Sequence, residues 1–221
     1  MNYIKKLNLP STPLRDGAIN ELTALKKEFK KSTTSSRVSG WNPHVVTEVD
    51  QFLSYELLDI LRPFGLTPSY LVNFGQLDRL HWITPIHTDI SPIEGNKKVT
   101  FAINWELTST KSQWNWWDTA NATVMVPSTG METITRQKLG GLRYVNFEEF
   151  DQSIVDKYGF KILESYRVLP HTAYLLRTDL PHNIEYHNPT PERVSISVRF
   201  DTATILTWED TIKLFEPLIV E

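Results

Sequence analysis

The first third of the chain has apolar residues at helical spacing. Residues 16–31 place isoleucine, leucine and phenylalanine on one stripe and lysines on the opposite side, a pattern that predicts an amphipathic helix. After a polar connector, a second helix is expected to begin with Thr47 as its N-cap and to end before Pro63 and Gly65. Both helices are expected to pack against the outside of a β-sheet.

Beyond residue 66 the apolar positions follow the two-residue period of β-strands. The clearest alternation covers 98–107. The strands predicted in this way are 70–74, 81–86, 98–107, 113–118, 123–126, 141–145, 161–168, 173–177, 183–186 and 193–201. One set of helical turns interrupts them at 146–158, and a helix is expected over 207–219. Many short strands with few helices between them predict a mainly β protein with flanking helices, built as an antiparallel sandwich or barrel.

Composition and charge narrow the classes of function. The 221 residues suit one domain, and a net charge of −3 gives no overall attraction to nucleic acid or to an anionic membrane. No apolar run is long enough for a membrane span, and the first residues lack the apolar core of a signal peptide, so the cytoplasm is the expected compartment. The absence of cysteine excludes disulfides and thiolate ligands, so nitrogen and oxygen atoms must hold any metal.

Two histidines and a carboxylate form the candidate metal site. His87 and Asp89 are two residues apart, which in a strand places both side chains on one face. His182 begins another β-prone stretch far along the chain, and the alternating strand that follows puts Arg193 and Ser195 on a common face. Two histidines and one carboxylate are the ligands of the facial triad, which holds ferrous iron by three positions and leaves the others open.

This set of residues resembles the 2-oxoglutarate/Fe(II)-dependent dioxygenases. The pattern of that family is HxD, a long gap, a distal histidine, and then an arginine with a small hydroxyl residue two positions later. Here these positions are His87, Asp89, His182, Arg193 and Ser195. Within the family, the chain looks most like the small stand-alone oxygenases common in phage and bacterial genomes.

The resemblance covers roughly residues 68–203 and implies a fold. The family fold is the double-stranded β-helix, or jelly roll, which accounts for the strand pattern above. A single domain is therefore expected, with 1–66 as an N-terminal helical support, 67–206 as the double-stranded β-helix and 207–221 as the C-terminal helix.

The resemblance also implies a reaction and its cofactors. The three candidate ligands would bind Fe(II), and Arg193 with Ser195 would bind the C5 carboxylate of 2-oxoglutarate, since a guanidinium can take a carboxylate by two parallel hydrogen bonds. Asn104, on the strand after HxD, is a candidate for a further hydrogen bond to 2-oxoglutarate. The expected activity is hydroxylation, with dioxygen consumed and 2-oxoglutarate oxidatively decarboxylated.

Four tryptophans form a second unusual concentration, and they have two interpretations. Trp105, Trp114, Trp116 and Trp117 are either core residues, as large aromatic residues on strands commonly are, or an aromatic rim around the mouth of the site. Because Trp105 alternates with Asn104, only one of these two can face the site.

Two other functions fit a jelly roll. The chain could be a non-catalytic binding or structural module without iron, or a metal-dependent cupin-type enzyme that does not use 2-oxoglutarate. Arg193 and Ser195 argue against the cupin, which needs no carboxylate clamp there. The substrate stays open between a small molecule and a peptide side chain, because a shared fold does not select a substrate. The mild acidity disfavours nucleic acid, and no membrane partner is expected.

Overall fold

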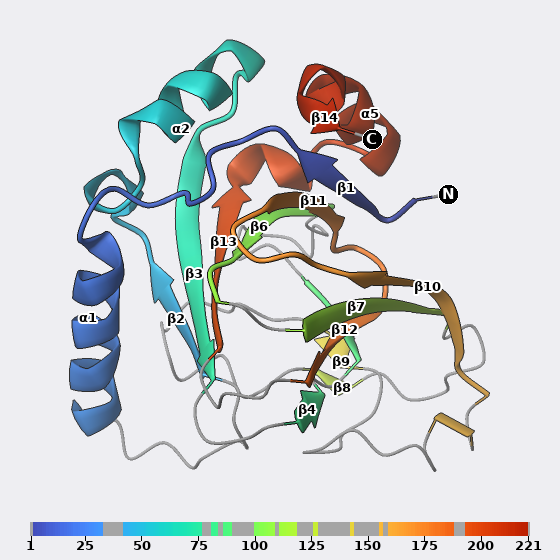
Figure 1. The fold of residues 1–221 in the computed structure, drawn as a ribbon. Helices are drawn as coiled ribbons and strands as arrows, with labels where there is room; N and C mark the ends of the chain where they lie inside the picture. Colours follow the sequence, from blue (N-terminus) through green and yellow to red (C-terminus); the bar gives the residue numbers. More distant parts are fainter. Residues whose placement is uncertain are drawn as a thin grey trace.

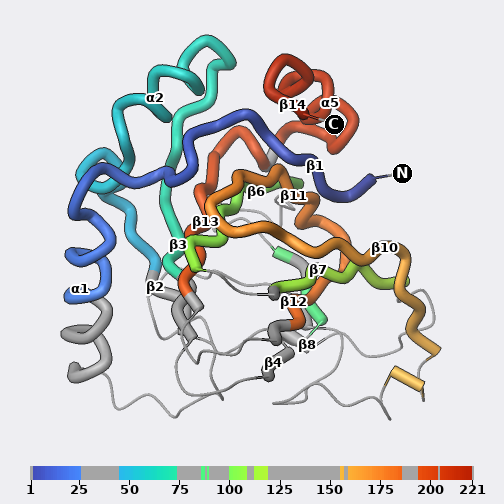
Figure 2. Tube along the Cα trace, in the orientation of Figure 1, coloured from blue at the N-terminus to red at the C-terminus, as the bar shows by residue number. Residues whose placement is uncertain are grey.

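Two antiparallel β-sheets make up most of the computed structural model, with short helices against one of them (Figure 1; Figure 2 shows the same view as a tube). This architecture confirms the predicted mainly β class with flanking helices. The structure describes residues 2–32, 42–76, 81–83, 86–89, 100–108, 111–118, 126–127, 142–143, 155–156, 159–187 and 193–220.

The first sheet brings together strands from both ends of the chain. Every pairing described within it is antiparallel and, with the exception of one pair, neighbouring strands are not consecutive in the sequence. Its order is β14 (Ile219–Val220), β1 (Ile4–Leu7), β11 (Ala173–Arg177), β6 (Phe101–Glu106), β13 (Arg193–Phe200), β3 (Pro68–Gln76) and β2 (Asn42–Val46).

The second sheet contains the strands that carry the two candidate histidine ligands. Its order is β10 (Lys161–Arg167), β7 (Lys111–Asp118), β12 (His182–His187), β5 (His87–Thr88), β9 (Leu142–Arg143) and β8 (Val126–Pro127), and β4 (His81–Ile83) pairs with β12.

Helices cover the outer face of the first sheet (Figure 1). They are α1 (Ala18–Ser32), α2 (Tyr55–Leu61) and α5 (Trp208–Phe215), with short 3-10 turns at Val49–Gln51, Arg62–Phe64, Asp201–Thr204 and Glu216–Leu218. No helix in the described segments has the length and apolar character needed to cross a bilayer.

Strict alternation along β6 separates the two cores of the molecule. Phe101, Ile103 and Trp105 belong to the outer core, which fills the space between the first sheet and the helices. Asn104 and Glu106 are also buried but point the other way, toward the second sheet. The outer core also takes in Leu22 from α1, Leu57 and Leu61 from α2, and Trp208 and Phe215 from α5.

A smaller inner core joins the two sheets. Its buried members are Ile4, Trp114, Trp116, Val168, Tyr174, Leu176 and Ile184. They come from β1 and β11 of the first sheet, from β7 and β12 of the second, and from the residue after β10. This core occupies only part of the space between the sheets. Buried polar side chains such as Asn104 and Glu106 occupy another part.

The N-terminal 66 residues differ from the prediction. They contain strands β1 and β2 in addition to helices, so this region contributes to the sheet it was expected only to support. Thr47 is not a helix cap: α2 begins later, where the hydroxyl of Ser54 accepts a hydrogen bond from the backbone N–H of Leu57 at 3.2 Å. A polar residue followed by an apolar run indicates a cap, but Ser54 shares that signal with Thr47.

The C-terminal region follows the prediction more closely. Thr207 caps α5 by accepting from the N–H of Asp210, and the chain then ends in a 3-10 turn and β14 instead of continuing as a helix. Of the strands predicted at 123–126 and 141–145, only β8 and β9 fall within the described residues, and the helical turns predicted at 146–158 fall almost entirely outside them.

Candidate metal centre

The fold brings the three predicted metal ligands to one point. One ligand atom from each of His87, Asp89 and His182 lies within 4.8 Å of the other two. The pairing of β5 with β12 sets His87 directly opposite His182, and the two imidazole rings have centroids 4.5 Å apart. Asp89 follows β5 immediately. The group that the sequence predicted from a two-residue spacing and a distant histidine is therefore assembled across two strands of one sheet.

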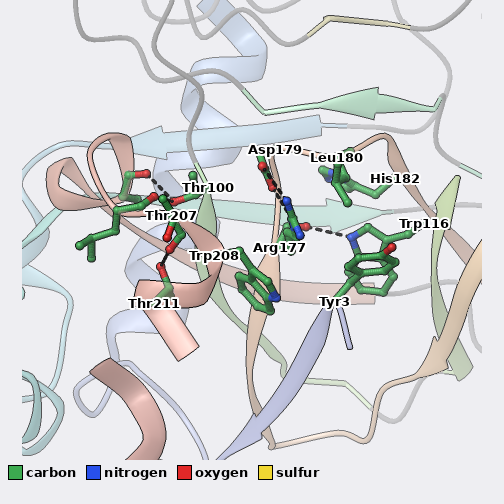
Figure 3. Close-up of polar contacts among 12 residues, drawn as sticks. Tyr3, Thr100, Trp116, Arg177, Asp179, Leu180, His182, Thr207, Trp208 and Thr211 are labelled. Atoms are coloured by element: carbon green, nitrogen blue, oxygen red, sulfur yellow. Dashed lines mark hydrogen bonds and ion pairs between the residues drawn. The ribbon is translucent and has the colours of Figure 1, made fainter. Parts of the chain in front are cut away.

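His182 is buried and has one ring nitrogen available for a metal. Its Nδ1 lies 2.8 Å from the carbonyl oxygen of Leu180 (Figure 3 shows the two residues side by side). A carbonyl can only accept, so Nδ1 carries the proton and Nε2 keeps its lone pair. Burial, with the neighbouring His87, lowers the pKa of His182 to about 4 despite the opposing influence of Asp89. The imidazole is neutral at neutral pH, the form that binds metal ions.

A turn between β11 and β12 holds two of the ligands in place. Its residue Thr178 accepts a hydrogen bond from the backbone N–H of Asp89 at 3.0 Å, and its residue Leu180 holds the ring of His182. At the start of the turn the guanidinium of Arg177 pairs with Asp179 (Figure 3). One short segment thus sets the backbone of one ligand and the ring orientation of another.

Two tryptophans of β7 connect this region to the inner core. The indole N–H of Trp116 donates to the carbonyl oxygen of Arg177 at 2.9 Å (Figure 3). Trp114 stacks on the ring of His182, with centroids 5.6 Å apart and an interplanar angle of 26°. The imidazole ring of His182 is therefore held by stacking on Trp114 and by its hydrogen bond to Leu180.

The two carboxylate oxygens of Asp89 face different partners. Oδ1 lies 3.7 Å from Nε2 of His87, on the side of the ligand group. Oδ2 accepts a hydrogen bond from Nη1 of Arg199 at 2.5 Å. Burial alone would raise the pKa of Asp89, but the charge of Arg199, with that of the two histidines, lowers the pKa to about 2. Asp89 is therefore a carboxylate at neutral pH.

Arg199 was not predicted to act at the metal; the sequence offered it only as the alternative to Arg193 for binding 2-oxoglutarate. It lies on the inward face of β13 and is only 6% exposed. Asp89 raises the pKa of its guanidinium against the opposing effect of burial, so Arg199 stays charged. The alternation of the strand already placed this arginine on the face of Ser195, but no sequence feature could pair it with a carboxylate 110 positions away.

Two of the predicted 2-oxoglutarate residues, Ser195 and Asn104, lie on the inward face of the first sheet. Ser195 is buried opposite Glu106, in the pairing of β13 with β6. Asn104 is also buried, and its Oδ1 accepts a hydrogen bond from the hydroxyl of Ser197 at 2.5 Å. The backbone of Arg193 begins β13, but its side chain lies outside the described part of the structure, so its predicted role stays a prediction.

Glu106 is a buried carboxylate that the sequence prediction missed. Its two oxygens accept hydrogen bonds from the hydroxyls of Thr108 at 3.1 Å and Ser112 at 3.0 Å. The alternation of β6 gave the signal for it, since Glu106 is two residues from Asn104. The inner space thus changes from a metal-ligand group at the Arg199 end of β13 to a polar, hydroxyl-rich region at the Ser195 end.

The tryptophans are divided between faces. Trp105 points away from the site into the outer core, where its indole N–H donates to the carbonyl oxygen of Pro10 at 2.9 Å. Trp114 and Trp116 belong to the inner core, and Trp117 on the opposite face of β7 donates to Asn183. All four are buried, which supports the interpretation as packing residues, although Trp114 also contacts a candidate ligand.

The donor set suits a first-row divalent ion. Two imidazole nitrogens and one carboxylate oxygen match the facial ligand set, and one ligand atom from each group lies within 4.8 Å of the other two. No protein-family model matches this chain, and no curated protein matches its sequence. The geometry of the centre is therefore the basis for any functional assignment.

Proposed function

We propose that the protein is an Fe(II)- and 2-oxoglutarate-dependent oxygenase, a hydroxylase, on a double-stranded β-helix. The observation that supports this most directly is the convergence of His87, Asp89 and His182 from two strands of one sheet. Two facing antiparallel sheets with the ligand group between them are compatible with a jelly roll. The ligands themselves are the residues that the resemblance to the dioxygenase family named in advance.

The charge balance of the site favours an anionic co-substrate. The carboxylate of Asp89 and the guanidinium of Arg199 cancel, and His182 is neutral. A divalent ion held there keeps both of its positive charges in a largely buried space, where charge is costly unless it is paired. A dicarboxylate such as 2-oxoglutarate would bring one carboxylate to the ion and the other to Arg193, whereas an uncharged co-ligand would bring no negative charge to the site.

In this proposal the residues of the protein bind and orient the metal ion and the co-substrate, and they exclude water from the site. His87, Asp89 and His182 would hold the iron, while Arg193, Ser195 and Asn104 are proposed to bind 2-oxoglutarate. When bound, iron and 2-oxoglutarate supply the oxidising chemistry, in which 2-oxoglutarate and dioxygen are consumed and succinate and CO2 are released. The substrate is a small molecule or a peptide side chain.

One observation favours the rival, a non-catalytic jelly-roll module. Asp89 already has a charged partner in Arg199, so its carboxylate does not need a metal ion to be satisfied. A purely structural ion pair is therefore a complete explanation for one of the three ligands. It explains neither the tautomer of His182, which leaves a lone pair on Nε2, nor the close approach of the two imidazoles, both of which the oxygenase does explain.

Anaerobic addition of Fe(II) and then 2-oxoglutarate tests the proposal. The oxygenase should develop a weak visible charge-transfer band only when both are present, and admission of oxygen should yield succinate. His182→Ala should abolish both signals. His171→Asn is the matched control, because His171 is an exposed histidine with φ 53° and asparagine tolerates that conformation. A wild-type protein that binds no iron would leave the structural module as the better assignment.

A second experiment tests the role of Arg193 in binding 2-oxoglutarate. Arg193→Lys keeps the charge but loses the two-point fork, so the 2-oxoglutarate requirement should rise while iron binding is unchanged. Arg193→Ala should raise it further. Unchanged 2-oxoglutarate affinity in Arg193→Ala would remove Arg193 from the proposed site and leave iron ligation unaffected.

A further inference from the structure

The contacts of Asp89 divide its carboxylate between a metal position and a buried arginine. Oδ2 is held by Nη1 of Arg199, while Oδ1 faces Nε2 of His87. The backbone N–H of Asp89 is tied to Thr178, so the main chain of the ligand is anchored as well. With one oxygen held, rotation of the carboxylate about its last bond is restricted.

Arg199 is committed to this contact. It is 6% exposed, and Asp89 is its ion-pair partner among the described residues. The Nε atom is buried and has no hydrogen-bond partner there. A buried guanidinium with an unsatisfied N–H is unfavourable unless its charge is compensated, and among the described residues Asp89 makes the largest compensating contribution.

Besides the two histidines, Tyr70 is an ionisable side chain close to this pair. It lies opposite Arg199 in the pairing of β3 with β13, and burial raises the pKa of its phenol. A neutral phenol brings no negative charge to the guanidinium. Asp89 therefore remains the group that neutralises Arg199.

We propose that Arg199 is a positioning residue of the metal centre, which holds Oδ2 of Asp89 so that the carboxylate offers a single oxygen, Oδ1, to the ion. The inference rests on the metal centre proposed above and names a residue that acts through a ligand. A one-oxygen carboxylate with two imidazoles occupies three coordination positions on one face. If Asp89 bound through both oxygens, one of the positions left for co-substrate and dioxygen would be lost.

Cobalt(II) titration of the full chain, followed by visible absorption, tests this role without turnover. Arg199→Gln should weaken cobalt binding about tenfold or more, since loss of a partner that orients a ligand typically has an effect of this size. It should also change the cobalt spectrum, because Oδ2 becomes free to coordinate. Arg199→Lys, which keeps a charge and a donor, should recover part of the affinity and of the spectrum. Arg15→Gln, which breaks an ion pair with Glu21 on the surface, should leave both unchanged.

The two arginine variants also distinguish orientation from simple repulsion. If Arg199 did no more than repel the ion, removing its charge would tighten binding, and Arg199→Gln would bind cobalt better than the wild type. Tighter or unchanged binding with the wild-type spectrum would refute the positioning role and leave the metal centre standing. Failure of the wild type itself to bind cobalt would refute the metal centre, and with it this inference.

Thermal unfolding of the metal-free protein gives an independent readout. Asp89→Ala leaves the charge of Arg199 buried and unpaired, which should lower Tm by about 10 °C. Asp89→Ala with Arg199→Met removes both charges and should regain most of that loss. His87→Ala, which leaves the pair of Asp89 with Arg199 in place, should change Tm far less. If Asp89→Ala fails to fold, Asp89→Asn keeps an acceptor for Arg199 and should still lower Tm. Equal Tm values for the Asp89 single variants and the wild type would show that Arg199 is not committed to Asp89.

Discussion

Strands β6 and β13 each have two faces made from alternate residues, and the two faces differ in chemistry: one is apolar and the other is polar. The face toward the helices carries Phe101, Ile103, Trp105, Ile196 and Val198, all completely buried in the outer core. The face toward the second sheet carries polar side chains that are nearly as buried: Asn104, Glu106, Ser195, Ser197 and Arg199.

The difference between these faces lies in how burial is compensated. On the helix side, removal of apolar area from water is itself stabilising. On the inner side several polar groups depend on a particular partner, such as Ser197 for Asn104 or Asp89 for Arg199. The face toward the helices therefore stabilises the fold through the apolar area that it buries. The face toward the second sheet places polar groups through specific hydrogen-bonded and ionic pairs, which a single substitution can break.

Substitution on the helix side should have the largest effect on stability and none on the metal. Trp105→Ala removes a fully buried indole and its hydrogen bond to Pro10, so the free energy of unfolding should fall by about 3–5 kcal/mol. Urea unfolding in the presence of a chelator measures this loss, and cobalt titration at a temperature where the variant is folded should give wild-type affinity. A parallel fall in cobalt affinity would show that the two faces are not independent.

Metal binding should stabilise the protein through the inner face. At an ion concentration about one hundred times Kd, the free energy of unfolding should rise by about 2.7 kcal/mol. His182→Ala should lose this increment, whatever its own baseline stability, while His171→Asn should keep it. Unfolding curves with and without Mn(II) under anaerobic conditions give the comparison. An equal increment in His182→Ala would indicate that the ion binds elsewhere.

Breaking a polar pair on the inner face should have a smaller, pair-specific effect. Ser197→Ala removes the donor to Oδ1 of Asn104 and should reduce the free energy of unfolding by about 1 kcal/mol. Because replacing both members by apolar groups avoids the unsatisfied amide, Asn104→Leu combined with Ser197→Ala should be less destabilising than the sum of the single variants. Additive losses would mean that the two residues do not depend on one another.

The smallest expected signal is slow self-oxidation during turnover without substrate. Trp114, which stacks on His182, and Trp116 beside it should gain oxygen, whereas Trp105 on the helix side should be spared. Peptide mass spectrometry after aerobic incubation with iron and 2-oxoglutarate would detect the modification, with His87→Ala as the control. Equal modification of Trp105, or equal modification in the control, would assign the oxidation to iron in free solution.

Local patterns predicted the parts of this molecule that depend on local structure. The two-residue period identified the strands around Asn104, Ser195 and Arg199, and the spacing of His87 and Asp89 put both on one side. These predictions hold because side-chain direction in a strand is set by the backbone itself. The class of fold followed from the number and spacing of such strands.

The remaining features depend on contacts between distant segments. The segment Ile4–Leu7 is too short for its residue pattern to predict a strand. It forms β1 because it pairs with β11 on one side and β14 on the other. Similarly, the pair of Asp89 with Arg199 arises from the way β13 passes the end of β5, which no spacing in the sequence encodes. Ser54, not Thr47, caps α2, whose Leu57 and Leu61 are buried in the outer core; both residue types suit an N-cap, so the local signal alone did not choose between them.

The strand register that sets His87 opposite His182 determines when the candidate metal site is completed during synthesis and folding of the chain. While the chain is being synthesised, His87 and Asp89 emerge long before His182, and two ligands alone form an incomplete site. The third ligand arrives only after a loop of about a hundred residues has closed, which is a late and entropically costly step. Metal binding at the proposed centre would therefore be coupled to completion of the second sheet: an ion could stabilise a nearly complete fold, but it could not nucleate one.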